Sequence, residues 1–321
     1  MSNPLLDFSG LPRFADFQTE YVTTAIDALL KENRALLEQV RSDRQPVTWQ
    51  NFVQPMVDAN ERLSRAWGQV SHLNAVMNNR QLREVYNQNL PLITQFYAEL
   101  SQDLALFEKF KQLRKSNEFQ GLSTARKKII DNELRDFRLG GAELTADKKQ
   151  RFLEIQEALS KLSSNFSDNL LDATNAFALY IESEDTVKGI PNDVLQMAQE
   201  QAAADTKVGW KFTLHMPSYL PVMQYANNRD LREKMYHAYV TRASELERIT
   251  EADLDNMPII NSILKLRQEA AELLGYSNYA EVSLATKMAT SPQQVLDFLK
   301  KLADKAKPHA DKDLQELREF A

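Results

Sequence analysis

Apolar residues recur at intervals of three and four along most of the chain, which is the spacing of an amphipathic α-helix. One stripe contains Val22, Ile26, Leu29, Leu36 and Val40, and a second contains Phe52, Met56, Leu63, Trp67 and Val70. The longest stripe contains Phe152, Ile155, Leu159, Leu162, Phe166, Leu170 and Ala173. Strand patterns are few. The sequence therefore predicts a mostly α protein, a multi-helix body with at most a small β element.

Residues with capping preferences mark the ends of two of these helices. Thr145 is expected to cap the longest helix at its N-terminus, with Asp147 in the first turn near the positive end of the helix dipole. Gly275 stands where a helix ending at Leu274 needs a residue with left-handed backbone conformation.

A further helix start is predicted near the C-terminus. Ser291-Pro292-Gln293-Gln294 is typical of a capping box with proline at the first helical position. We expect the apolar residues that follow to form the buried face of this helix; they are Val295, Phe298, Leu299 and Leu302.

Two short segments favour strands, and one glycine pair favours a break. Residues 208–214 (VGWKFTL) and 178–182 (ALYIE) are rich in β-branched and aromatic side chains and can pair as a small sheet, although short apolar runs also occur in buried helices. Gly140–Gly141 predicts a domain boundary, because paired glycines seldom lie inside a helix. We therefore predict a helical domain over residues 1–140 and a second helical region with the small sheet over 141–321.

Composition narrows the classes of function. The 321 residues contain 43% hydrophobic and 26% charged residues, only 8 glycines and no cysteine, and the formal net charge is −6. The absence of cysteine excludes disulfides, thiolate catalysis and cysteine-ligated zinc in this chain. The acidic balance without a basic cluster argues against nucleic acid as a partner.

The N-terminus and the lack of long apolar runs bear on location. Residues 1–10 have neither a basic start nor a long apolar core, so no signal peptide is expected. No run approaches the ~20 apolar residues of a membrane-spanning helix. We therefore expect no membrane association and a cytoplasmic location.

A search for catalytic motifs gives a negative result. The histidines are His72, His215, His237 and His309, and none belongs to H-E-x-x-H, in which two imidazoles at i and i+4 bind zinc and the glutamate activates water. Glycine-rich phosphate loops and the G-x-S-x-G elbow are absent as well. We therefore assign no catalytic residue and no metal ligand, expect no cofactor in this chain, and leave substrate-binding residues unassigned.

Aromatic residues between the predicted second strand and the following helices have two interpretations. They are Trp210, Tyr219, Tyr225, Tyr236 and Tyr239. Such amphipathic side chains suit a groove that holds an extended peptide, but packing in the core is the default for each of them.

Four stretches carry a resemblance to a known family. They are residues 136–177, residues 209–220 (GWKFTLHMPSYL), residues 229–244 (RDLREKMYHAYVTRAS) and residues 256–289. The last contains LLGYSNYAE followed by KMA, and it is the most specific. Together they resemble the N-terminal half of the thimet oligopeptidase (M3) family of zinc metallopeptidases. The opening NPLLD and the lack of cysteine fit its bacterial members better than its animal members.

The resemblance implies a fold and a location for the catalytic residues. Members of the family are mostly helical ellipsoids with a deep channel that admits short, unstructured peptides. Their chain crosses between the two sides of the channel more than once. Their single zinc ion, H-E-x-x-H helix and further glutamate ligand lie in the C-terminal half. The resemblance therefore implies that this chain is a wall of the channel, inactive alone, with short peptides and the catalytic half as its partners.

Two other hypotheses stay open at this stage. A non-enzymatic helical scaffold or interaction protein also fits the periodicity and the lack of motifs, while a metal-independent hydrolase would need dispersed residues that no motif marks. The segment that ends at Ala321 is patterned as helix without a stop signal, which is an indication of a chain cut from a longer one. On that interpretation the chain exposes apolar surface and is expected to self-associate.

Overall fold

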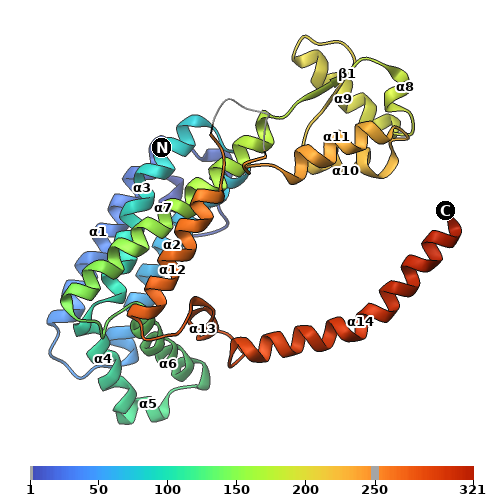
Figure 1. Ribbon diagram of the computed structural model, residues 1–321. Coiled ribbons are helices and arrows are strands. Elements are labelled where there is room, and N and C mark those ends of the chain that lie inside the picture. The colour runs from blue at the N-terminus through green and yellow to red at the C-terminus, as the bar shows by residue number, and fades with distance from the viewer. Residues whose placement is uncertain (1–2, 247–252) are drawn as a thin grey trace. The chain divides into compact units, whose positions relative to one another are not determined.

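The computed structural model describes residues 3–246 and 253–321, which are mostly helical (Figure 1). They form two compact units: Met1–Ser160 with Leu266–Ala321, here called unit 1, and Lys161–Lys265, here called unit 2. Two long helices, α7 (Ala146–Ala176) and α12 (Met257–Leu273), begin in one unit and end in the other. The predicted mostly α class is confirmed. No helix of the described residues is both long and apolar enough to span a membrane.

Unit 1 is built on a bundle of helices from the N-terminal part of the chain. They are α1 (Glu20–Ser42), α2 (Gln54–Val76), α3 (Arg80–Ser101), α4 (Leu104–Lys115), α5 (Asn117–Gly121) and α6 (Thr124–Leu139). Three short turns precede or join them: η1 (Pro4–Leu6), η2 (Phe14–Asp16) and the π-helical η3 (Trp49–Val53). Helix α1 packs against α2, α3 and α4.

The apolar stripes predicted from the sequence form the core of this bundle. Val22, Ile26 and Leu29 of α1 are fully buried, as are Leu63 and Val70 of α2. The remaining members of the two stripes are buried or packed against the core at its margin. The helical periodicity therefore identified the core-facing sides of α1 and α2 correctly.

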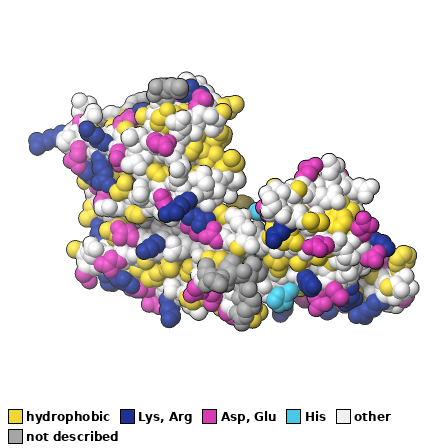
Figure 2. Space-filling model, turned by 90° about the horizontal axis from the view of Figure 1, so that it is seen from above, with side chains coloured by type: hydrophobic (Ala, Val, Ile, Leu, Met, Phe, Trp, Pro, Cys, Tyr) yellow, Lys and Arg dark blue, Asp and Glu magenta, His cyan; other side chains and the backbone are white. Residues whose placement is uncertain are grey.

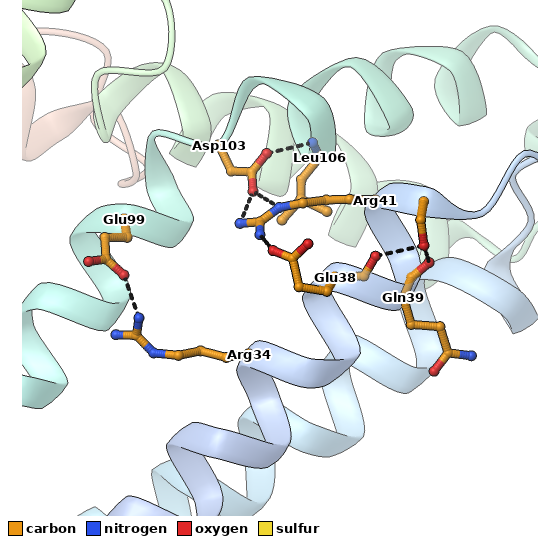
Figure 3. Close-up of polar contacts among 8 residues, drawn as sticks. Arg34, Glu38, Gln39, Arg41, Glu99, Asp103 and Leu106 are labelled. Carbon is orange, nitrogen blue, oxygen red and sulfur yellow. Dashed lines mark hydrogen bonds and ion pairs between the residues drawn. The ribbon is translucent and has the colours of Figure 1, made fainter.

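Ion pairs at one end of the bundle hold α1 to α3 and α4 (Figure 3). Arg41 donates through Nε to Oδ2 of Asp103 at 2.6 Å, and it also pairs with Glu38 one turn earlier. Asp103 in turn accepts the Leu106 backbone N–H at 3.0 Å and so caps α4. Because its side chain is only 8% exposed, Asp103 connects the two helices through a largely desolvated carboxylate.

The first half of α7 and the second half of α12 share a small core within unit 1. Phe152, Ile155 and Ala270 are buried there. A bidentate pair lies beside this core, in which Arg151 donates to the two carboxylate oxygens of Glu269 at 2.6 and 2.8 Å.

The predicted start of α7 and end of α12 are confirmed. Helix α7 begins at Ala146, directly after Thr145. A hydrogen bond from Thr145 lowers the pKa of Asp147 below its usual value. Gly275 follows α12 with φ +82°, and the Tyr276 N–H donates to the Ala271 carbonyl at 2.9 Å, which closes the helix end.

The last two helices of unit 1 correct one expectation. Helix α13 spans Tyr279–Leu284 and α14 spans Pro292–Phe320. Ser291 caps α14 by accepting the Gln294 N–H at 3.1 Å, as predicted. The expected buried face was wrong, because Phe298 is 64% exposed and Leu299 and Leu302 are each more than half exposed. The short helix α13 contacts α14, and the apolar stripe of α14 remains largely exposed to solvent.

Unit 2 contains shorter elements. They are β1 (Leu179–Ile181), α8 (Glu184–Val187), α9 (Asn192–Ala204), β2 (Trp210–Phe212), α10 (Met216–Tyr225) and α11 (Arg229–Val240). The predicted sheet is confirmed, although both strands are shorter than expected. The strands pair antiparallel with Leu179 opposite Phe212 and Ile181 opposite Trp210. The helices α9, α10 and α11 supply most of the remaining core of this unit.

Two glycine positions bear on how the chain is divided. Gly140 ends α6, and Gly141 has φ +87°, so the predicted helix break is confirmed. Units 1 and 2 are defined by how compactly their residues pack, and the boundaries between them fall within α7 and α12. The sequence-based domain boundary at Gly140 stays a prediction.

Candidate functional site

The four histidines lie apart on different elements. His72 is on α2 beside the ring of Phe14, His215 precedes α10, His237 is on α11 and His309 is on α14. Within residues 3–246 and 253–321, no three His, Asp or Glu side chains converge in a way that could hold a metal ion. Zinc needs at least three protein ligands in known catalytic sites. The donor set of the described residues therefore does not fit a zinc ion.

The aromatic cluster in unit 2 divides between core and surface. Trp210 and Tyr219 are buried, and Tyr219 stacks on Tyr239 with ring centroids 4.1 Å apart. Burial raises the pKa of the Tyr219 hydroxyl above its usual value. Tyr225 and Tyr236 are about half exposed. The core interpretation therefore holds for three of the five residues.

An arginine also packs against the ring of Tyr239. The Arg242 guanidinium lies 3.8 Å from the centre of the Tyr239 ring and donates to Thr174 Oγ1 at 2.9 Å. Because Thr174 lies on the last turns of α7, this arginine connects α7 to the end of α11. The aromatics thus stabilise unit 2 and leave its surface groove to other residues.

An open groove of about 640 Å³ runs along α11 in unit 2. One side is apolar and comes from the segment around β1 and the segment after α11; its residues are Phe177, Leu179 and Leu246. Most of the rest of the lining is polar: Asp230, Glu233, Lys234 and His237 are exposed on α11, and the buried Thr241 directly follows the helix. We call this feature the α11 groove.

The local sequence explains why the charged residues and His237 of α11 face outward together. Asn228 caps α11 by accepting the Leu231 N–H at 2.9 Å, which fixes where the helix begins. Leu231 and Met235 are buried and hold the helix against the core. Residues 230, 233, 234 and 237 then fall on a neighbouring face, because steps of three and four bring side chains onto one side of a helix.

The composition of the groove suits an extended peptide. Two carboxylates, one ammonium group and one imidazole offer both donors and acceptors for main-chain groups, and the apolar side can accept side chains. Neither sign of charge dominates, and basic and acidic side chains are likewise interspersed over the face drawn in Figure 2. The groove residues that the structure describes offer binding and positioning groups, and among them no nucleophile is hydrogen-bonded to a base.

Sequence reasoning finds part of this groove. It identifies His237 as an isolated histidine, and α11 lies in one of the four stretches that carry the family resemblance. Phe177 lies in another of these stretches and Leu179 in a predicted strand, but no sequence pattern connects them to α11, because they come from a different part of the chain. The clustering of charge at residues 230–237 on one helical face is the available signal.

Comparisons with known proteins cover the whole chain. Residues 26–149 match the family model Neurolysin/Thimet oligopeptidase, N-terminal domain, and residues 222–321 match the model of Peptidase family M3. The chain is 48% identical over 321 residues to oligopeptidase A of Haemophilus influenzae, which covers 100% of this chain and 47% of that protein. It is 44% identical to oligopeptidase A of Escherichia coli, with the same coverage. It is 40% identical to the probable cytosolic oligopeptidase A of Arabidopsis thaliana over 100% of this chain and 46% of that protein. The chain thus spans about half the length of the relatives it matches.

Proposed function

The chain belongs to peptidase family M3, as its motifs predicted, and we propose that it serves as the N-terminal, channel-wall portion of a zinc oligopeptidase that hydrolyses short peptides. The zinc-binding H-E-x-x-H helix is supplied from sequence that these 321 residues do not contain. The chain alone neither binds zinc stoichiometrically nor cleaves peptides.

One observation carries this proposal. The identity of 48% to an oligopeptidase A extends over the full chain but over 47% of that relative. A scaffold without enzymatic relatives would not be expected to match a peptidase over 321 residues.

The α11 groove gives this half of the enzyme a role toward substrate. An extended peptide laid along α11 can place its apolar side chains against Phe177 and Leu179, and its amides can pair with the polar side chains of the helix. The groove thereby guides peptides without taking part in bond cleavage. Folded proteins do not present extended segments to such a surface, which favours short substrates.

The exposed stripe of α14 is the natural contact for the catalytic half. Its apolar residues include Phe298, Leu302 and Leu317, each more than half exposed. Burying such side chains contributes roughly 1.5–3 kcal/mol each when the burial is complete. We therefore assign α14 to the interface between this portion and the catalytic portion of the enzyme, and a cytoplasmic location to the whole.

Metal analysis combined with a peptide assay tests the proposal. The purified chain is loaded with zinc, dialysed against buffer and analysed for bound metal, and turnover of internally quenched short peptides is followed in parallel. We expect far less than one zinc ion per chain and no turnover above buffer. Stoichiometric zinc, or cleavage that follows the chain through successive purification steps, would overturn the assignment.

A binding measurement tests the α11 groove separately. Fluorescence anisotropy with labelled short peptides is compared between the parent chain, Glu233→Lys in the groove and Glu200→Lys on α9. Because exposed charges contribute up to ~1 kcal/mol, we expect a change in affinity of up to about fivefold for Glu233→Lys only. Equal affinities in all three proteins would remove the groove from the proposed function without affecting the metal result.

A further inference from the structure

Helix α6 carries a glutamate on its buried face. Ile130, Leu134 and Phe137 are buried in the core of unit 1. Glu133 follows Ile130 by three residues and precedes Phe137 by four, so it shares their side of the helix and is half-buried itself. Glutamate is seldom placed on such a face, because desolvation penalises the carboxylate.

The Glu133 side chain lines a cavity of about 90 Å³ inside the bundle. The inner wall is apolar, with Leu37, Val53, Phe96 and Leu106 all buried. These residues come from α1, η3, α3 and α4, so the cavity lies where the main helices of unit 1 meet. Val57, which is 40% exposed, marks the mouth of the cavity.

No cation of the described residues forms an ion pair with this carboxylate, and Arg135, which attracts it electrostatically, makes its hydrogen bonds elsewhere. Glu133 makes no side-chain hydrogen bond or ion pair with them, and burial raises its pKa above the usual value. The neighbouring Arg135 is bound in bidentate fashion to Asp136. On α1, Arg34 pairs with Glu99 at 3.1 Å, as Figure 3 shows.

A second acceptor lines the same cavity. Asn33 is buried, and its Nδ2 donates to the carbonyls of Leu29 and Ala59 at 2.9 and 3.2 Å. Both of its N–H donors are thus used, and its Oδ1 makes no hydrogen bond with the described residues. Glu133 and Asn33 therefore offer three acceptor oxygens, which matches the three N–H donors of a primary ammonium group.

We propose that this cavity is a binding site for a primary alkylammonium group, with the nitrogen at Glu133 and Asn33 and the hydrocarbon against Leu37, Val53 and Leu106. The size supports a short chain, since an apolar cavity of roughly 150 Å³ accommodates benzene and this one is smaller. A free aliphatic amine and the side chain of a peptide lysine share this chemistry.

The mouth of the cavity is compatible with both sources. Asn60 lines the mouth, and its Oδ1 accepts from the Tyr97 hydroxyl at 2.9 Å, which orients the amide. Its Nδ2 makes no hydrogen bond with the described residues and can donate to the carbonyl of a lysine main chain.

Titration with n-butylammonium chloride, followed in methyl NMR spectra, tests the site. We expect saturable shifts at the methyls of Leu37, Val53 and Leu106, and weaker binding of n-butanol. Glu133→Gln should weaken n-butylammonium binding about tenfold or more, because the negative charge and one of the two acceptor oxygens of the carboxylate are lost. Glu143→Gln, a substitution outside the cavity, should bind as the parent does. Unsaturable shifts, or equal affinity in Glu133→Gln, would overturn the proposal.

Two further measurements complete the design. Val57→Phe should obstruct the mouth and weaken n-butylammonium and n-butanol alike, whereas unchanged binding in this variant would also overturn the site. Titrations with N-acetyl-lysine amide and with its side-chain-acetylated form show whether the ammonium group comes from a lysine side chain or from a free amine. Binding of the former alone indicates a lysine side chain, and binding of n-butylammonium without either lysine compound indicates a free amine.

Discussion

The close approach of β1 and β2 at Gly209 gives a sharp test of the fold of unit 2. Gly209 has φ +90° and directly precedes β2. A Cβ at this position would lie 2.1 Å from the Ile181 carbonyl oxygen and 2.9 Å from its carbon. Backbone atoms of β1 cannot rotate away as a side chain can. We therefore predict that Gly209→Ala destabilises unit 2.

The expected magnitude follows from three contributions. An alanine at positive φ costs about 1–2 kcal/mol. Moving β1 away from β2 weakens the pairing of Ile181 with Trp210, and a backbone hydrogen bond contributes about 1 kcal/mol. Partial exposure of Trp210, which is 8% exposed, adds a further loss of similar size. The sum is roughly 3 kcal/mol, which corresponds to a urea midpoint lower by about 2 M when the m-value is ~1.5 kcal/mol/M.

Tryptophan fluorescence measures this change selectively. The chain contains 3 tryptophans, of which Trp49 and Trp67 belong to unit 1 and Trp210 to unit 2. In a background with Trp49→Phe and Trp67→Phe, Trp210 reports the urea unfolding of unit 2 alone. The Gly209 variant is compared with the parent in that same background.

Two alanine substitutions in unit 1, followed through Trp49 and Trp67 in a background with Trp210→Phe, separate the contributions. Gly275 has φ +82°, and no atom lies within 4 Å of the place that an alanine methyl would occupy, so Gly275→Ala should cost only the conformational term of about 1 kcal/mol. Gly68 lies inside α2 with open space around it, and Gly68→Ala should stabilise unit 1 by about 0.5–1 kcal/mol. If Gly209→Ala loses no more than Gly275→Ala, the close contact between the strands does not exist in solution and the reasoning is refuted.

Three further predictions concern other parts of the chain. Light scattering should show that the parent chain self-associates, because Phe298 and Leu302 of α14 are each more than half exposed. The double variant Phe298→Glu, Leu302→Glu should be a monomer. A monodisperse, monomeric parent would contradict this prediction. The buried Asn256 side chain accepts a hydrogen bond from Asn169 and donates one to the Phe166 carbonyl. Asn256→Ala should therefore lower the free energy of unfolding of unit 2 by about 2 kcal/mol in urea titrations. An unchanged urea midpoint would count against this role. Hydrogen bonds from Lys211, and to a smaller extent from Tyr180, lower the pKa of Asp205. These bonds therefore contribute to the stability of unit 2 above the usual carboxyl pKa, and this stability is lost as the pH falls below about 4. Trp210 fluorescence should follow this loss in the parent and show a smaller acid dependence in Asp205→Asn.

The sequence identified the helices whose apolar faces meet inside one bundle. Steps of three and four from Val22 to Val40 predicted the buried side of α1, and Gly275 predicted the end of α12. These features are local, because a helix face and a helix end depend on residues within a few turns of each other. The same reasoning failed at Phe298 and Leu302, since burial also requires a partner surface, and periodicity carries no information about that partner.

The candidate sites depend on contacts that no local pattern contains. The α11 groove combines His237 with Leu179, which lies nearly sixty positions earlier in the chain on β1. The acceptors in the cavity inside the unit 1 bundle combine Glu133 of α6 with Asn33 of α1. A sequence search by motif recognises one helix or one loop at a time, so it could detect the family but not these surfaces.

Glu133 nevertheless shows how a sequence pattern can point to such a site. A glutamate between Ile130, Leu134 and Phe137 interrupts an otherwise apolar helix face, and its desolvation must be compensated by a hydrogen bond, a proton or a cation. The described residues provide no ion pair for it. Glu133→Leu should therefore raise the free energy of unfolding of unit 1 in the absence of ligand, because it removes an uncompensated carboxylate and fills part of an apolar cavity. Saturating n-butylammonium should stabilise the parent but not this variant in thermal unfolding. Stabilisation of both proteins to the same extent would show that the carboxylate has no part in binding.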